Sequence, residues 1–164
     1  MISPKMQDAM NEQIKHELES AYLYFSMVAY FESLGWEGMA AWMQAQAQEE
    51  VEHAMKFFHH IVERDGRVLL KAIAKPQEEW DSPQAAFEAA YKHEQFITSK
   101  IHELVKLAEA EKDYAANVFL QWFVTEQVEE EASTSRVAQL LARVKESSNG
   151  MVMLDRELGR READ

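Results

Sequence analysis

Apolar residues recur at alternating steps of three and four along most of the chain, which is typical of helices that bury one face. Alternation of the kind expected for strands is absent, and 5 Gly and 3 Pro supply few breaks. The pattern therefore predicts an all-α protein. We expect long helices over about 5–33, 37–64, 83–110 and 113–144, and a short helix over about 151–160.

Helix boundaries are marked by local signals. Ser3-Pro4 and Ser82-Pro83 each place a capping serine before a proline at the first helical position, so a helix begins at each. Gly35 and Gly66 follow long periodic segments and predict helix ends. A turn at 111–113 is the weakest of these signals, and Asn149-Gly150 is expected to precede the short last helix.

The connections between helices constrain the topology. The first and third connections are short, so each joins an antiparallel hairpin. The second takes about 18 residues and can reach ~60 Å, whereas a helix of about 29 residues is ~43 Å long. It can therefore run the full length of the molecule and place the third helix parallel to the second. We expect residues 1–164 to form one domain, an antiparallel four-helix bundle with one long crossover.

Carboxylates interrupt the apolar rows. Following the core-facing positions of each long helix places Glu17, Glu50, Glu94 and Glu130 near the centre of the four stripes, and no row contains Lys or Arg. The core rows are Ile14, Glu17, Ala21, Tyr24, Val28 and Phe31; Met39, Met43, Gln46, Glu50, His53, Phe57 and Ile61; Phe87, Tyr91, Glu94, Thr98, Ile101, Val105 and Ala108; Ala116, Leu120, Phe123, Gln127, Glu130, Thr134, Val137 and Leu141.

An internal repeat carries the same charges. A shift of 77 residues superposes Lys15-His16-Glu17 on Lys92-His93-Glu94 and Gly35 on Lys112. The same shift pairs Glu49 with Glu126, Glu50 with Gln127, Glu52 with Glu129, and His53 with Glu130. Glu17 and His53 lie 18 positions from Gly35, and Glu94 and Glu130 lie 18 from Lys112, so all four belong near mid-bundle. This pattern indicates a duplicated hairpin.

Four carboxylates in an apolar interior require compensating positive charge, because an unpaired buried charge costs several kcal/mol. With His53 neutral as a ligand, two divalent cations match the four negative charges. Glu50-x-x-His53 places an oxygen and a nitrogen ligand one turn apart on a helix face, a set that suits iron or manganese. The alternative, an acidic face turned to solvent, fits Glu52 and Glu131 best.

Composition narrows the class of protein. The net charge of −12 argues against nucleic acid as a partner and favours cations. The absence of cysteine excludes iron–sulfur clusters and thiol catalysis. The longest uncharged run, 20–31, is too short for a membrane span, and the first residues lack the apolar core of a secretory signal. A cytoplasmic protein without membrane association is expected.

At these residues the chain resembles the prokaryotic non-haem ferritins, from "NEQIKHELESAYLYFSM" through "FLQWFVTEQVEEE" to the short last helix. The resemblance implies a ferritin-like fold in which Glu17, Glu50 and His53 hold a first iron, and Glu50, Glu94 and Glu130 a second. It places Gln127 beside the pair and Tyr24 at a near-site tyrosine position. A third iron site would comprise Glu49, Glu126 and Glu129, with Glu130 shared.

The resemblance also implies the activity. Such proteins store iron as ferroxidases: Fe(II) is oxidised to Fe(III) by O₂ or H₂O₂ at the di-iron centre, and ferric mineral collects inside a shell of twenty-four identical chains. No haem is expected, because the second Glu-x-x-His of the haem-binding relatives is replaced by Gln127-x-x-Glu130. We further expect Gln127 to bind the ring nitrogen of His53 that faces away from the metal.

Several alternatives stay open at this point. Tyr24 has either a redox or hydrogen-bonding role or is a core tyrosine with a satisfied hydroxyl. His16 and His93 lie one residue off the core rows and are expected to face away from the site. The rival functions are a di-iron peroxidase or oxygenase in which the iron stays bound, and a metal-free structural bundle.

Overall fold

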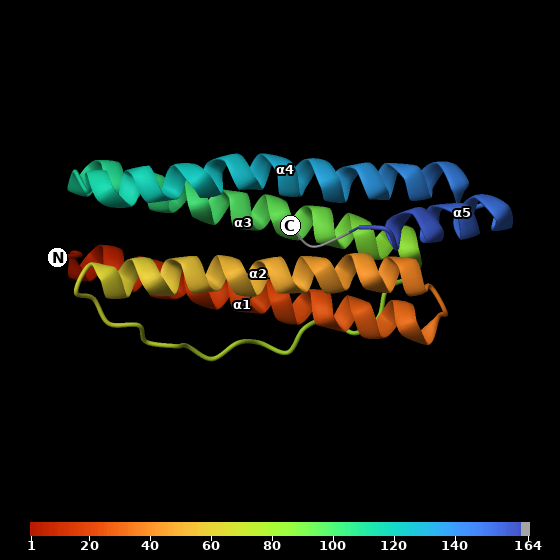
Figure 1. Ribbon diagram of the computed structural model, residues 1–164, viewed down its shortest axis with the longest axis horizontal. Coiled ribbons are helices and arrows are strands. Elements are labelled where there is room, and N and C mark those ends of the chain that lie inside the picture. The colour runs from red at the N-terminus through yellow and green to blue at the C-terminus, as the bar shows by residue number, and fades with distance from the viewer. Residues whose placement is uncertain (162–164) are drawn as a thin grey trace.

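The computed structural model describes residues 1–161, which form five α-helices and no strand (Figure 1). The helices are α1 (Pro4–Ser33), α2 (Glu37–Glu63), α3 (Pro83–Glu111), α4 (Tyr114–Val144) and α5 (Ser148–Leu158). The prediction of an all-α protein with four long helices and one short helix is confirmed. Within 1–161, no helix combines the length and apolar character needed to cross a bilayer.

Both Ser-Pro signals begin helices as predicted. Ser3 Oγ accepts a hydrogen bond from the backbone N–H of Met6 at 3.1 Å, and Ser82 Oγ accepts one from that of Ala85 at 3.1 Å. Each serine thus satisfies one of the N–H groups that a helix start leaves without a partner.

The predicted start of α5 was wrong. Ser147 Oγ accepts a hydrogen bond from the Gly150 backbone N–H at 3.1 Å, so the helix begins at Ser148 and ends at Leu158. Asn149 and Gly150 lie in its first turn and do not precede it. A capping serine therefore decided the boundary, against the turn preference of the Asn-Gly pair.

The two hairpin turns have the same backbone geometry. Gly35 and Lys112, equivalent under the 77-residue shift, both adopt left-handed φ, 76° and 54°. In each turn the next residue donates to a carbonyl five positions earlier: Trp36 N–H to Phe31 O at 3.0 Å, and Asp113 N–H to Ala108 O at 2.8 Å. The duplicated hairpin extends to the turns. After α2, the left-handed residue is Asp65, one position before the expected Gly66.

The long crossover, residues 64–82, runs beside α1 from one end of the molecule to the other, and α3 consequently runs parallel to α2 (Figure 1). It is fastened to α1 by side chains. Asn11 donates to Arg67 O at 3.1 Å and accepts from the Leu69 N–H at 2.9 Å, and the Tyr30 hydroxyl donates to Trp80 O at 3.0 Å. The predicted bundle with one long crossover is confirmed.

The buried apolar residues form two clusters, one toward each end of the bundle. One contains Phe31, Phe87 and Leu141, and the other contains Ile14 and Phe57. The predicted core rows are buried except at four positions that stay partly accessible, namely Val28, Tyr91, Thr98 and Val105. Polar residues of the same rows occupy the layer between the clusters.

The short helix α5 packs against α2 and α4. A Cβ atom on Gly38 would lie 1.7 Å from the Asp155 carbonyl oxygen, so only glycine allows this approach. The Asp155 side chain accepts a hydrogen bond from the Met39 backbone N–H at 2.8 Å. Since Trp36, the N-cap of α2, makes no side-chain cap, Asp155 supplies the missing acceptor from α5.

Candidate metal centre

Four carboxylates, one from each long helix, meet in the layer between the two apolar clusters. Glu17, Glu50, Glu94 and Glu130 are 1%, 1%, 0% and 4% exposed. Among residues 1–161, no Lys or Arg forms an ion pair with any of them. The acidic interior expected from the sequence is therefore present, and in the described chain it is not paired with Lys or Arg.

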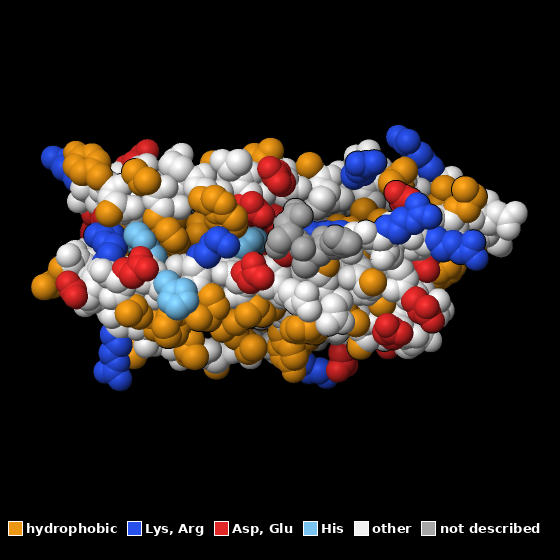
Figure 2. Space-filling model, viewed as in Figure 1, with side chains coloured by type: hydrophobic (Ala, Val, Ile, Leu, Met, Phe, Trp, Pro, Cys, Tyr) orange, Lys and Arg blue, Asp and Glu red, His pale blue; other side chains and the backbone are white. Residues whose placement is uncertain are grey.

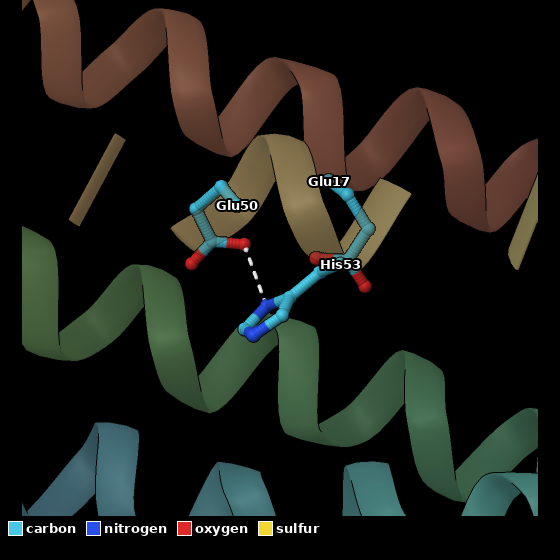
Figure 3. A group of neighbouring side chains, drawn as sticks. All are labelled: Glu17, Glu50 and His53. Atoms are coloured by element: carbon cyan, nitrogen blue, oxygen red, sulfur yellow. Dashed lines mark ion pairs between the residues drawn. The ribbon is translucent and has the colours of Figure 1, made fainter. Parts of the chain in front are cut away.

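The first hairpin contributes an open group of ligands: Glu17, Glu50 and His53 (Figure 3). One ligand atom from each lies within 4.8 Å of the others, and His53 Nδ1 is 3.3 Å from Glu50 Oε2. Gln13 Nε2 donates to Glu17 Oε1 at 2.8 Å. Glu17 Oε2, both Glu50 oxygens and His53 Nδ1 are buried without a hydrogen-bond partner in the described chain. A divalent cation fits this donor set, because buried oxygens lacking donors are costly.

The carboxylates of the second hairpin are held by hydrogen bonds. The Tyr24 hydroxyl donates to Glu94 Oε1, and Gln127 Nε2 donates to Glu94 Oε2 at 3.1 Å. Gln46 Nε2 donates to Glu130 Oε2. These bonds fix the two carboxylates in place before any metal binds.

A second ligand group consists of His53, Glu126 and Glu130. His53 Nε2 lies 3.8 Å from Glu126 Oε1. The prediction that Gln127 binds this ring nitrogen was wrong, because the Gln127 amide points across the second hairpin to Glu94. Glu126, one residue earlier on α4, occupies the expected position.

Burial dominates the electrostatics of the layer. Burial raises the pKa of Glu50 well above its usual range, that of Glu94 to about 7, and that of Glu130 to about 8. The negative charge of Glu94 raises the pKa of Glu50 and Glu130 further. Burial alone would lower the pKa of His53, but Glu126 and Glu50 beside the ring raise it to about 11. Without a cation the layer therefore retains protons near neutral pH.

Beside the buried layer, α2, α4 and α5 border a groove of about 930 Å³. Acidic side chains lie near its middle, and basic side chains lie on both sides of them, with several toward the α5 end (Figure 2). Of the residues expected at a third iron site, Glu126 reaches His53, Glu129 is exposed, and Glu49 receives a hydrogen bond from Arg161 at 2.7 Å. The structure thus places all three along the groove, and within residues 1–161 they do not form one ligand group.

A family model, the ferritin-like domain, matches residues 7–144. The chain belongs to the ferritin family. It is 40% identical over 161 residues to a bacterial non-heme ferritin of Bacteroides fragilis, covering 98% of this chain and 100% of the relative. A non-heme ferritin of Staphylococcus aureus is 34% identical over 164 residues, with 100% and 99% covered.

Solved ferritin structures superpose closely on this fold. An Archaeoglobus fulgidus ferritin engineered into a closed form has a TM-score of 0.99 and 51% identity, with 100% of both chains covered. A second structure, described as an open-pore ferritin from the same archaeon, has a TM-score of 0.98 at 51% identity, with 99% and 100% covered. The predicted family and fold are confirmed.

The remaining candidate residues of this ferritin lie either beside the carboxylate layer or away from it. Tyr24 is fully buried and its hydroxyl contacts Glu94, so it is both a satisfied core tyrosine and a neighbour of the site. His93 Nε2 lies 2.7 Å from Ser20 Oγ, and the His16 ring packs edge-on against Phe96. Neither histidine belongs to the ligand groups found in the described chain, as their positions off the core rows predict.

Three residues of the site in this ferritin were not predicted to act there: Gln13, Gln46 and Arg161. Gln13 and Gln46 lie four residues before Glu17 and Glu50, on the same buried helix faces. A glutamine on a core face one turn from a carboxylate was a usable signal, and Gln46 already interrupts an apolar row. Arg161 had no such signal, because it lies beyond the last helix.

Proposed function

We propose that this protein stores iron, oxidising Fe(II) to Fe(III) with O₂ or H₂O₂ at the buried carboxylate layer and depositing the ferric product inside a shell of identical chains. The observation that carries the proposal is the set of buried ligand atoms without hydrogen-bond partners at Glu17, Glu50 and His53. Membership of the ferritin family supports the same conclusion.

The layer would accept two iron ions per chain as substrate. Glu17, Glu50 and His53 would bind the first, and Glu50, Glu94 and Glu130 the second, with Gln127 beside the pair. Four carboxylates and two Fe(II) ions balance in charge, which is the arrangement that makes burial of these groups tolerable. The protein's part is to hold both ions close enough to deliver electrons to one oxidant.

The residues of the layer would release protons as iron binds, and their neighbours would hold the carboxylates in position. Because the pKa values of Glu94 and Glu130 are about 7 and 8, both carboxyls are partly protonated at neutral pH and release protons when iron binds. The Tyr24 and Gln127 donors keep Glu94 oriented through that change. Glu126, Glu49 and Glu129 continue the acidic path into the groove, where a third iron would bind on its way to the mineral.

Iron-loading stoichiometry tests this function against its two rivals. Aerobic addition of Fe(II) should load far more than two or three ions per chain, in a particle near twenty-four chains by light scattering. A di-iron peroxidase or oxygenase would saturate at about two ions per chain, and a structural bundle would bind none. Either saturation result, obtained with folded protein, would reject iron storage.

A further inference from the structure

Arg161 lies directly over the groove side of α2. Its guanidinium is 4.3 Å from the centre of the Trp42 ring, Nη2 donates to Glu49 Oε2 at 2.7 Å, and Nη1 donates to Gln46 Oε1 at 2.8 Å. The side chain is only 23% exposed. Three contacts on one helix face fix the position of this cation.

The backbone before Arg161 is anchored as well. The Arg161 N–H donates to Leu158 O at 3.2 Å, which continues the last turn of α5. A Cβ atom on Gly159 would lie 3.1 Å from the Gly38 Cα atom, so the chain passes α2 at close range. The packing of α5 against α2 therefore places the Arg161 guanidinium beside Glu49.

Gln46 extends the contact to the buried layer. Its amide oxygen accepts from Arg161, so its amide nitrogen faces the opposite way and donates to Glu130 Oε2. If the Gln46 amide were reversed, its N–H groups would face the Arg161 guanidinium and its oxygen would face the Glu130 carboxylate. Both contacts would be unfavourable. Arg161 thereby sets the orientation of the side chain that holds Glu130.

We propose that Arg161 is a tethered cation that competes with iron for Glu49, and that its displacement releases the Gln46 hold on Glu130. The inference rests on the proposed function, specifically on an iron site that uses Glu49. Iron bound at Glu49 would repel the guanidinium and draw charge from the carboxylate, so the ion pair with Arg161 would weaken. Gln46 is then free to turn, so iron in the groove and the hydrogen bond on Glu130 are coupled.

The chain contains a matched control for this role. Arg160 precedes Arg161, and its side chain is 78% exposed with an ion pair to Glu157 at 3.4 Å. A substitution there removes the same charge from the same segment without touching α2. Arg161→Lys is the conservative variant, since lysine keeps the charge but cannot bridge a carboxylate and an amide with one planar group.

The test is calorimetric titration of the full assembled protein, freed of metal, with Zn(II), which is redox-inert and so separates binding from oxidation. The wild type should show two tight sites and a weaker one. Arg161→Ala should tighten the weaker site by about three- to tenfold, Arg161→Lys by less, and Arg160→Ala should match the wild type. Adding Glu49→Ala to Arg161→Ala should remove the gain. Displacement should also change Trp42 fluorescence in the wild type and not in Arg161→Ala.

The possible results distinguish failure of the competition proposal from failure of the proposed function. If the two tight sites are present and Arg161→Ala leaves the weaker site unchanged, or weakens it, the competition proposal is wrong. Absence of a weaker site in both proteins would overturn it too, while leaving the di-iron layer intact. Absence of the two tight sites in the wild type would instead overturn the proposed function. A weaker site that appears only in Arg161→Ala would support competition.

Discussion

The two hairpins have the same backbone geometry at their turns, but their buried carboxylates differ in hydrogen-bond partners. In the α1–α2 hairpin, Glu17 retains one oxygen without a donor, and Glu50 retains two. In the α3–α4 hairpin, Glu94 accepts hydrogen bonds from Tyr24 and Gln127, and Glu130 accepts one from Gln46. In the first hairpin the atoms that would contact a cation accept no hydrogen bond, whereas the carboxylates of the second hairpin are already oriented by hydrogen-bond donors.

This difference indicates an order of binding. A cation at Glu17, Glu50 and His53 would contact buried oxygens that accept no hydrogen bond, and it would displace the proton that pairs His53 with Glu50. A cation at Glu94 and Glu130 also displaces protons, and it binds carboxylates that already accept hydrogen bonds and so gain less from it. We therefore expect the first-hairpin site to fill before the second.

The largest effect should follow from removal of the shared ligand. Glu50→Ala should slow the initial rate of Fe(II) oxidation by about a hundredfold or more, because it removes the carboxylate assigned to both ions. Stopped-flow absorbance of the ferric product measures this rate. Glu63→Ala, an exposed position on the same helix, is the control. A rate near wild type in Glu50→Ala would refute the site assignment.

Removal of the His53 imidazole should affect the two metal sites unequally. His53→Ala should weaken the first-filled site by about tenfold in anaerobic Fe(II) titrations, with a much smaller change in the second, since Glu17 and Glu50 remain. His59→Ala changes an exposed histidine of the same helix and should have no effect. If only the second site weakened, the assignment of His53 to the first hairpin's metal would be wrong.

The metal-free protein should lose stability as pH rises from about 5 to 8. Glu94 and Glu130 have pKa values of about 7 and 8 in the folded chain, against an ordinary value of 4.5. A carboxyl group with a raised folded pKa contributes stability at low pH that is lost as pH rises through that pKa, here on the order of 3 kcal/mol for each of the two groups. Chelator-treated protein unfolded by denaturant at several pH values measures it.

The control for this pH profile is the pair of substitutions Glu94→Gln and Glu130→Gln. Neutral amides cannot titrate, so the doubly substituted protein should show a flatter stability profile over the same range, with the remaining slope due to Glu50 and His53. A wild-type profile that is already flat, or that rises with pH, would contradict the description of the layer as a buried set of protonated carboxyls.

The smallest effect should come from the hydroxyl that holds Glu94. Tyr24→Phe should destabilise the metal-free protein by about 1–2 kcal/mol, because a buried carboxylate loses a donor. The loss should shrink when iron is bound, since the metal then satisfies Glu94. Thermal unfolding with and without Fe(II) compares the two states. An equal loss in both would show that the hydroxyl matters only for packing.

The regular features of this fold were predictable because they depend on neighbours in sequence. Ser3 and Ser82 begin helices through local caps, and the 111–113 turn, the weakest prediction, separates α3 from α4 as expected. The buried carboxylates were found because each interrupts an apolar row. The turn at Lys112 was supported by its equivalence to Gly35 and by no residue preference of its own.

Features that depend on distant residues could not be predicted in the same way. Gln127 was assigned to His53, but its amide reaches Glu94, a choice made by the packing of α3 on α4. Asp155 caps α2 from the far end of the chain, and Arg161 reaches Glu49 only because α5 docks there. No periodicity in the sequence encodes the contacts of Asp155 and Arg161, because they join segments more than 100 residues apart.

The position of the carboxylate layer between two separate apolar clusters has a consequence for a container that is filled and emptied. Each end of the bundle is packed by its own residues, such as Phe57 and Phe123 at one end and Phe31 and Phe87 at the other. The walls therefore need no cargo to keep their form. Loss of iron should therefore leave the packing at both ends of the bundle unchanged.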